Sequence, residues 1–214
     1  MTPDLDLATA LTRIYRELAR LGLNNGSSGN VSARIDGDLL ITPTGATAES
    51  LTPESFVRMP LAGPARPGSS PSSEWPMHAA VYAACPEARC VVHTHADACT
   101  ALACLGEPLP AFHYMVVGFG GATVPCAPYE TFGTPALAEA AGQAIAGHKA
   151  CLLANHGMIC HGPDPQTALA GAVRLETLAR QYLLARGAGQ PRILSAEEVA
   201  AARLRYRSYG QPSR

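Results

Sequence analysis

Two histidines separated by one residue end an apolar run in the stretch "CVVHTHADAC" (90–99). If residues 89–95 form a β-strand, His93 and His95 point to the same face, because side chains alternate along a strand. Two imidazole nitrogens on one face are placed to hold a divalent cation. The spacing is also that of two core histidines hydrogen-bonded to backbone carbonyls, so the pair alone leaves both interpretations open.

A third histidine follows a second apolar run, Ala150–Ala154, in the segment Asn155-His156-Gly157. Three histidines at the exits of buried strands would form a His₃ set, which leaves a coordination position open for a substrate. Three unrelated core histidines would require the same coincidence three times.

One carboxylate and several small polar residues complete the candidate chemistry. Glu74 lies in "PSSEWPMH", just before a predicted helix, where it is a metal ligand, a general base or simply an acidic residue of a helix start. The hydroxyls of Ser72 and Ser73 beside that helix start are suited to an oxyanion. Two loops, "SSGNVS" (27–32) and "TPTG" (42–45), offer N–H groups and hydroxyls that either cradle a phosphate or form ordinary turns.

The elements that must position these residues alternate between helices and strands. Apolar residues at helical spacing predict helices at 5–21, 77–84, 96–105, 135–146, 168–184 and 196–206. Short apolar runs predict strands at 31–35, 39–42, 89–93 and 150–154. This order indicates a single layered α/β domain, and 214 residues suit one domain with a substantial core.

Composition narrows the class of protein. The formal net charge is −1, and no run of Lys or Arg provides the electrostatic footprint of a nucleic-acid or anionic-membrane binder. No apolar run approaches the roughly 20 residues that span a bilayer, and the N-terminus lacks the order of a signal peptide. Seven scattered cysteines without a CxxC pair are typical of reduced thiols, so we expect a cytoplasmic protein. Only 15% of the residues are charged, which reflects either an oligomer interface or an Ala/Pro/Gly-rich genome.

Eight motifs in order resemble those of zinc-dependent class II aldolases of the L-fuculose-1-phosphate aldolase type. They are "GLNNGSSGNVSAR", "LLITPTG", "SSEWPMH", "VVHTHA", "HYMVVGFGG", "CAPYETFGT", "LLANHG" and "ILSAEEVAAARLRYRSYG". The resemblance covers nearly the whole chain and implies one domain (1–214), a three-layer α/β/α fold with a central, largely antiparallel sheet. It also implies a cyclic homotetramer with active sites between subunits and a C-terminal tail (about 195–214) that reaches a neighbouring subunit.

The resemblance assigns the metal chemistry to four residues. His93, His95 and His156 match the ligands of one Zn²⁺ per subunit, with other divalent metals as alternatives. Glu74 matches a carboxylate that acts as the acid/base and can also ligate zinc. The implied reaction is reversible cleavage of a ketose 1-phosphate to dihydroxyacetone phosphate and an aldehyde. Zinc would replace a Schiff-base lysine, and the chain has a single lysine, Lys149.

The resemblance also assigns substrate-binding positions. The residues that match the phosphate site are Gly29, Asn30, Thr44, Gly45, Ser72 and Ser73. Tyr114 matches the tyrosine that handles the proton on the aldehyde-side oxygen. Tyr209 matches a C-terminal tyrosine that enters a neighbouring site, and Phe132 matches an aromatic near the aldehyde.

Some departures from the family pattern concern the aldehyde end. Thr94 stands where the sugar aldolase carries Asn, "ANHG" (154–157) replaces a version with another His, and "VVGFGG" (116–121) is bulkier than the usual Ala-rich stretch. Two substrate classes therefore stay open. One is L-fuculose 1-phosphate, and the other is the less polar 5-methylthioribulose and 5-deoxyribulose 1-phosphates of the salvage aldolases. A wall of Met115, Val117 and Phe119 would favour the latter.

Three alternatives use the same scaffold. A pentulose-phosphate 4-epimerase would be expected to carry an additional acidic residue near Tyr114, and a methylthioribulose-phosphate dehydratase would use the same metal. A non-catalytic adducin head domain lacks the zinc-binding histidines, all three of which are present in this chain.

Overall fold

The computed structural model describes residues 3–206, so Tyr209 lies outside the described residues. The helices are α1 (Pro3–Arg20), η1 (Pro53–Ser55), α2 (Trp75–Ala84), α3 (Asp97–Ala103), η2 (Tyr114–Phe119), α4 (Pro135–Ile145), α5 (Pro165–Ala188) and α6 (Ala196–Tyr206), where η marks a 3₁₀ helix. The strands are β1 (Asn30–Ile35), β2 (Asp38–Ile41), β3 (Val57–Pro60), β4 (Cys90–Thr94), β5 (Leu109–Pro110), β6 (Thr123–Val124), β7 (Cys126–Ala127), β8 (Ala150–Leu153) and β9 (Gly157–Gly162).

Seven strands form one sheet in the order β3-β2-β1-β4-β9-β8-β7, and β5 pairs with β6 separately. Every neighbouring pair in the large sheet is antiparallel except β7 and β8. The central, largely antiparallel sheet that the resemblance implies is therefore confirmed.

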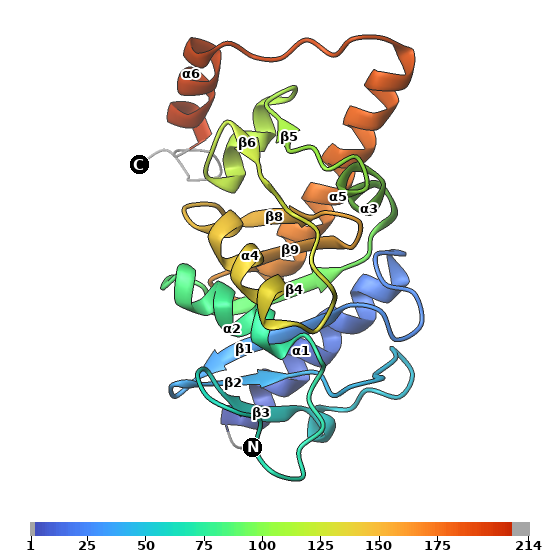
Figure 1. Cartoon of the computed structure of the whole chain (residues 1–214), viewed down its shortest axis with the longest axis vertical. Coiled ribbons are helices and arrows are strands. Elements are labelled where there is room, and N and C mark those ends of the chain that lie inside the picture. Colours follow the sequence, from blue (N-terminus) through green and yellow to red (C-terminus); the bar gives the residue numbers. More distant parts are fainter. Residues whose placement is uncertain (1–2, 207–214) are drawn as a thin grey trace.

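Helices cover both faces of this sheet, which gives three layers in one domain (Figure 1). Helices α1, α3 and α5 pack on one face and α2 and α4 on the other. Strand β4 shows the alternation clearly, because Cys90 and Val92 belong to the first core and Val91 belongs to the second. The same period of two turns His93 toward the α2/α4 side.

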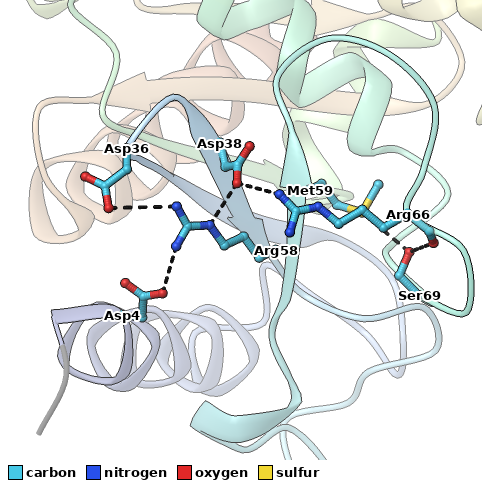
Figure 2. A network of polar contacts seen from close by, with 7 residues as sticks. All are labelled: Asp4, Asp36, Asp38, Arg58, Met59, Arg66 and Ser69. Atoms are coloured by element: carbon cyan, nitrogen blue, oxygen red, sulfur yellow. Dashed lines mark hydrogen bonds and ion pairs between the residues drawn. The ribbon is translucent and has the colours of Figure 1, made fainter.

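A network of charged side chains ties the edge strand β3 to its surroundings (Figure 2). Arg58 on β3 donates to Asp38 on β2 at 2.8 Å and to Asp4 on α1 at 3.1 Å, and its guanidinium lies 3.8 Å from Asp36. Arg66 donates to Asp38 at 2.7 Å. The Arg58 side chain is 33% exposed, so these pairs fix the edge while adding little to the free energy of unfolding.

The predicted elements match the structure with two kinds of difference. The helix predicted at 168–184 begins one turn earlier, at Pro165, because the Asp164 carboxylate accepts a hydrogen bond from the Thr167 N–H at 2.8 Å and Pro165 suits a first helical turn. Strands β3, β5, β6, β7 and β9 are additions to the predicted set. Three of these have only two residues, and β9 follows the turn after β8 too closely to be read as a separate element.

Candidate metal centre

The candidate ligands come from three separate parts of the fold that meet at one end of the sheet. His93 is the fourth residue of β4 and His95 follows that strand directly. His156 lies in the turn between β8 and β9, which pairs with β4 so that His93 is opposite Ile159. Glu74 immediately precedes α2 as its N-cap residue. The pairing of the strands therefore brings the three histidines together, and packing of α2 on the sheet adds the carboxylate.

A glycine makes this close approach possible. A Cβ atom on Gly157 would lie 2.4 Å from the carbonyl oxygen of Thr94 and 3.1 Å from Cδ2 of His95. Asn155, two residues earlier, adopts a positive φ of 53°. Asn is one of the residues that tolerates this left-handed conformation, which explains the tight turn between two buried strands.

The three imidazole rings are arranged almost symmetrically. Each pair of ring centroids among His93, His95 and His156 is 4.9 Å apart, with interplanar angles of 76°, 76° and 77°. Nε2 of His93 lies 3.0 Å from Nε2 of His95. Two nitrogens held tetrahedrally at roughly 2.0–2.1 Å from one zinc ion are separated by about 3.3 Å, so the rings stand close to a coordinating arrangement.

The Glu74 carboxylate closes the fourth side of this cluster. Oε2 lies 3.2 Å from Nε2 of His93, and Oε1 lies 3.1 Å from Nε2 of His156. Glu74 is only 7% exposed, and Oε1 makes no hydrogen bond with the described part of the chain. A buried carboxylate oxygen without a donor is costly unless a ligand satisfies it.

The protonation states suit a cation. Nδ1 of His93 donates to the carbonyl of Met158 at 2.9 Å, which leaves the Nε2 lone pair facing the centre. Burial, assisted by His93 and His156, lowers the pKa of His95 to about 4, so this imidazole is neutral near pH 7. Burial opposes ionisation of Glu74, but His93, His156 and Asn30 outweigh it and hold the pKa of the carboxyl well below its usual range. Three imidazoles and one carboxylate form a donor set that fits a divalent metal ion.

The loops predicted to hold a phosphate lie together beside this centre. The Ser72 N–H donates to the carbonyl of Thr42 at 3.0 Å, and the Thr44 N–H donates to that of Ser70 at 3.0 Å. The Glu74 N–H donates to the Ser72 hydroxyl at 3.3 Å. The end of β2 and the segment before α2 are thus joined by backbone hydrogen bonds, with Glu74 at their junction.

The start of β1 forms the next part of this surface. Gly29 has a φ of 73°, and a Cβ atom there would lie 2.3 Å from Oδ1 of Asn24 and 2.8 Å from the carbonyl oxygen of His93, so only glycine fits. Asn30 follows, and its Nδ2 donates to Oε2 of Glu74 at 2.8 Å. Asn24 stands in the motif "GLNNGSSGNVSAR" but is not among the predicted site residues, although both polar atoms of its buried side chain lack a hydrogen-bond partner in the described structure.

The predicted aromatic residues are placed differently from one another. Gly133 lies against Ser73, with its Cβ position 3.6 Å from Cβ of Ser73, so the loop that carries the 70% exposed Phe132 borders the candidate site. Tyr114 is 50% exposed and stacks on His113 at the start of η2. The segment that follows Tyr114 packs on the α1/α3/α5 core, whereas His93 faces the opposite side of the sheet.

The predicted aldehyde wall differs from expectation, and part of the predicted C-terminal tail is described. Val117 is 6% exposed and packs with Val199 of α6, and Phe119 is 2% exposed in the α1/α3/α5 core. Neither side chain forms an exposed apolar wall, because both fill space inside the chain. Helix α6 packs on its own subunit, where Arg203 donates to the carbonyl of Gly120 at 2.6 Å. The reach of the tail (about 195–214) toward a neighbouring subunit stays a prediction, and the residues after Tyr206 lie outside the described range.

Fold and site together define a class: an α/β/α protein with a His₃–Glu centre that can hold a metal ion and in which Glu74 and His93 are buried. The chain belongs to the family described as Class II Aldolase and Adducin N-terminal domain, which matches residues 9–183. Within residues 3–206 no helix has the length and apolar character needed to cross a membrane.

Relatives and solved structures agree with this assignment. The chain is 44% identical over 205 residues to an L-fuculose phosphate aldolase of Escherichia coli O6:H1, covering 95% of each chain. It is 45% identical over 195 residues to a 5-methylthioribulose-1-phosphate/5-deoxyribulose-1-phosphate aldolase of Rhodospirillum rubrum, covering 91% of this chain and 88% of that one. A solved L-fuculose 1-phosphate aldolase superposes with a TM-score of 0.89 at 34% identity, covering 94% and 96%. The chain is an aldolase of the carbon–carbon lyase class.

Proposed function

We propose that this aldolase uses zinc to cleave a short ketose 1-phosphate into dihydroxyacetone phosphate and an aldehyde. The observation that carries the proposal is the convergence of three Nε2 atoms and the Glu74 carboxylate, whose ligand atoms all lie within 4.8 Å of one another. The relatives named above act on L-fuculose phosphate or on 5-methylthioribulose and 5-deoxyribulose 1-phosphates. Cleavage of the C3–C4 bond in any ketose 1-phosphate yields the same three-carbon product.

The chain offers neutral donors for the substrate phosphate. The candidate residues lie in three neighbouring segments: Gly29 and Asn30 at the start of β1, Thr44 and Gly45 after β2, and Ser72 and Ser73 before α2. The N–H groups of Thr44 and Ser72 donate to carbonyls within the chain, so the donors proposed for the phosphate are hydroxyls and the other backbone N–H groups, which bind phosphate without a lysine or arginine. We assign these loops to the phosphate, which places carbon atoms of the substrate over the His₃–Glu centre.

The chemistry that a divalent cation supplies when bound by His93, His95 and His156 is polarisation of the substrate carbonyl and stabilisation of the negative charge that develops as the C3–C4 bond breaks. Glu74 is ionised in the free protein, which is the form that removes a proton from the hydroxymethyl carbon of dihydroxyacetone phosphate. In the cleavage direction the same carboxyl group returns that proton to carbon.

The proton on the aldehyde-side oxygen requires a second group, and we assign it to Tyr114 with Tyr209. Tyr114 is half-exposed and its segment packs on the far side of the sheet from His93, which fits delivery from a neighbouring subunit. This supports a homotetramer with active sites between subunits. All seven cysteines are free, which supports a location in the reducing cytoplasm.

Proton exchange tests this function whichever aldehyde the enzyme releases. Dihydroxyacetone phosphate is incubated with the protein in deuterium oxide, and loss of one hydroxymethyl proton is followed by NMR. We expect stereospecific exchange that stops when a chelator removes the metal and returns when Zn²⁺ is added. Absence of exchange from a zinc-loaded protein would contradict the aldolase half-reaction and favour an epimerase or a dehydratase.

A further inference from the structure

An unbroken series of buried hydrogen bonds leads away from Glu74 into the protein interior. Nδ2 of Asn30 lies 2.8 Å from Oε2 of Glu74, and Oδ1 of Asn30 lies 2.5 Å from Nε2 of His78. Nδ1 of His78 lies 2.7 Å from the Ser32 hydroxyl, which is 2.9 Å from the Tyr82 hydroxyl. We call these residues, Asn30, Ser32, His78 and Tyr82, the buried relay.

The series follows from the periodicity of two elements. Glu74, His78 and Tyr82 are four residues apart along α2, so their side chains stack on one face of the helix. Asn30 and Ser32 are two apart on β1, so they share the face of the strand that meets this helix. The relay therefore passes between helix and strand at each step.

The direction of every hydrogen bond can be deduced from the carboxylate outward. An ionised carboxylate only accepts, so Asn30 presents its NH₂ group to Glu74 and its Oδ1 to His78. Nε2 of His78 must then carry the hydrogen. Burial lowers the pKa of His78 to about 3, so the ring is neutral and Nδ1 is an acceptor. Ser32 consequently donates to Nδ1 and accepts from Tyr82.

Burial makes this arrangement rigid. His78 and Ser32 are 0% exposed and Tyr82 is 1% exposed, so water does not replace a lost partner. If the His78 donor were removed, the buried Asn30 oxygen would lose its partner, and only Glu74 would hold the amide in its orientation. An amide turned by half a rotation would point Oδ1 at Oε2 of Glu74, and two acceptors would face each other.

We propose that His78, held by Ser32 and Tyr82, is a positioning residue that orients the Asn30 amide so that Oε2 of Glu74 is anchored and the carboxylate is held against the metal centre. The inference rests on the proposed role of Glu74 as the acid/base. Oε2 lies 3.2 Å from Nε2 of His93 and Oε1 lies 3.1 Å from Nε2 of His156, and only Oε2 is also held by the Asn30 amide.

The test compares His78→Leu, which removes both ring contacts, with His78→Gln, whose NH₂ group can still donate to Asn30. His161→Leu is the matched control, because His161 is a buried histidine at the other end of the sheet with Nε2 3.1 Å from the carbonyl of His148. For proton exchange with dihydroxyacetone phosphate we expect kcat of His78→Leu to fall roughly 10²-fold with KM nearly unchanged, as is typical of a misplaced catalytic group. His78→Gln should recover most of the rate, and His161→Leu should keep it.

A second measurement does not depend on turnover. At saturating Zn²⁺ we expect one metal per chain in every variant, because the three histidines are intact. The rise in Tm when Zn²⁺ is added to metal-free protein should be smaller in His78→Leu than in wild type and should match that of Glu74→Gln. An undiminished rise in His78→Leu would overturn the anchoring of Glu74.

Combination with Glu74→Gln distinguishes positioning from general damage. If His78 acts through Glu74, His78→Leu should lower kcat little further in a Glu74→Gln background. The same 10²-fold loss in both backgrounds would overturn the inference. If His78→Leu fails to fold, Ser32→Ala takes its place. Without the Ser32 hydroxyl, no donor faces Nδ1 of His78, so the ring hydrogen is no longer held on Nε2. We expect Ser32→Ala to lower kcat about tenfold, and a wild-type rate would contradict the relay. Failure of wild type itself to exchange would instead contradict the proposed function.

Discussion

Helix α2 joins two clusters of potential metal ligands that differ in a decisive way. Glu74 precedes its first residue and belongs to the His₃–Glu centre, whereas Cys85 follows its last residue and lies with Glu87 and His161. In both clusters the nitrogen, sulfur or oxygen atoms lie within 4.8 Å of one another. Proximity of ligand-type residues is therefore the same at both ends of the helix.

The two clusters differ in the hydrogen-bond partners of their ligand atoms. Sγ of Cys85 contacts the carbonyl oxygens of Ile145 and His148 at 3.8 Å each, and burial raises the pKa of this thiol to about 11. Nε2 of His161 lies 3.1 Å from the carbonyl of His148, so it carries a hydrogen and donates it. Glu87 is largely exposed. The thiol and the imidazole of this second cluster therefore contact backbone carbonyls, and the Glu87 carboxylate is exposed to solvent, so the cluster needs no cation.

In the His₃–Glu centre the backbone leaves ligand atoms directed at the middle of the cluster. The Met158 carbonyl takes the Nδ1 hydrogen of His93, which turns the free lone pair of Nε2 inward. Oε1 of Glu74 is left buried without a donor. The comparison teaches that a metal site is recognised by which nitrogen or oxygen the surrounding hydrogen bonds leave unused, rather than by the number of ligand-type residues nearby.

The largest expected effect comes from breaking the His₃–Glu centre itself. His95→Ala removes one of three ring nitrogens, and two histidines with one carboxylate hold a metal ion much less tightly. We expect zinc to be lost on dialysis and proton exchange with dihydroxyacetone phosphate to disappear. Metal analysis beside the exchange assay checks this. Exchange at the wild-type rate by metal-free His95→Ala would contradict the role of the centre.

An intermediate effect is expected from Glu176, which supports the centre from α5. Its carboxylate accepts from the N–H groups of Ala98 and Cys99 at 2.9 Å each and so fixes the start of α3, two residues after His95. In Glu176→Gln an NH₂ group would face one of these donors. We expect a loss of about 1–3 kcal/mol in the free energy of unfolding, measured by denaturant titration.

The metal content of Glu176→Gln sharpens the comparison. Since the three histidines and Glu74 are unchanged, zinc should still bind, with a lower affinity because the chain after His95 is less fixed. Glu197→Gln is a suitable control, because Glu197 is an exposed residue in the first turn of α6. A stability equal to wild type in Glu176→Gln would mean that the two buried hydrogen bonds contribute nothing.

The resemblance assigns the three histidines, and simple periodicities agree with that assignment. His93 near the end of β4 and His95 just after it are two residues apart, and an apolar run places His156 at the exit of a second strand. The resemblance adds Glu74 and the antiparallel sheet. Each of these features depends on neighbours in the chain or on a motif of a few residues.

The buried relay and the second cluster cannot be predicted in the same way. His78 and Ser32 are 46 residues apart and meet only because α2 packs on β1. Cys85 and His161 are isolated residues in the sequence, since no local pattern shows that α2 and β9 end at the same place. The spacing of Glu74, His78 and Tyr82 is visible as a helical face, but its partner strand is not.

The smallest expected effect concerns the second cluster and tests whether that cluster binds a cation. Cys85→Ala removes a buried sulfur whose only described hydrogen-bond partners are two backbone carbonyls. We expect a loss of about 1 kcal/mol in the free energy of unfolding from the cavity, with kcat and KM of proton exchange unchanged. Metal analysis should find one zinc per chain in wild type and in the variant. A second equivalent in wild type that disappears in Cys85→Ala would show that a thiol engaged with carbonyls still binds a cation, and the distinction between the two ends of α2 would fail.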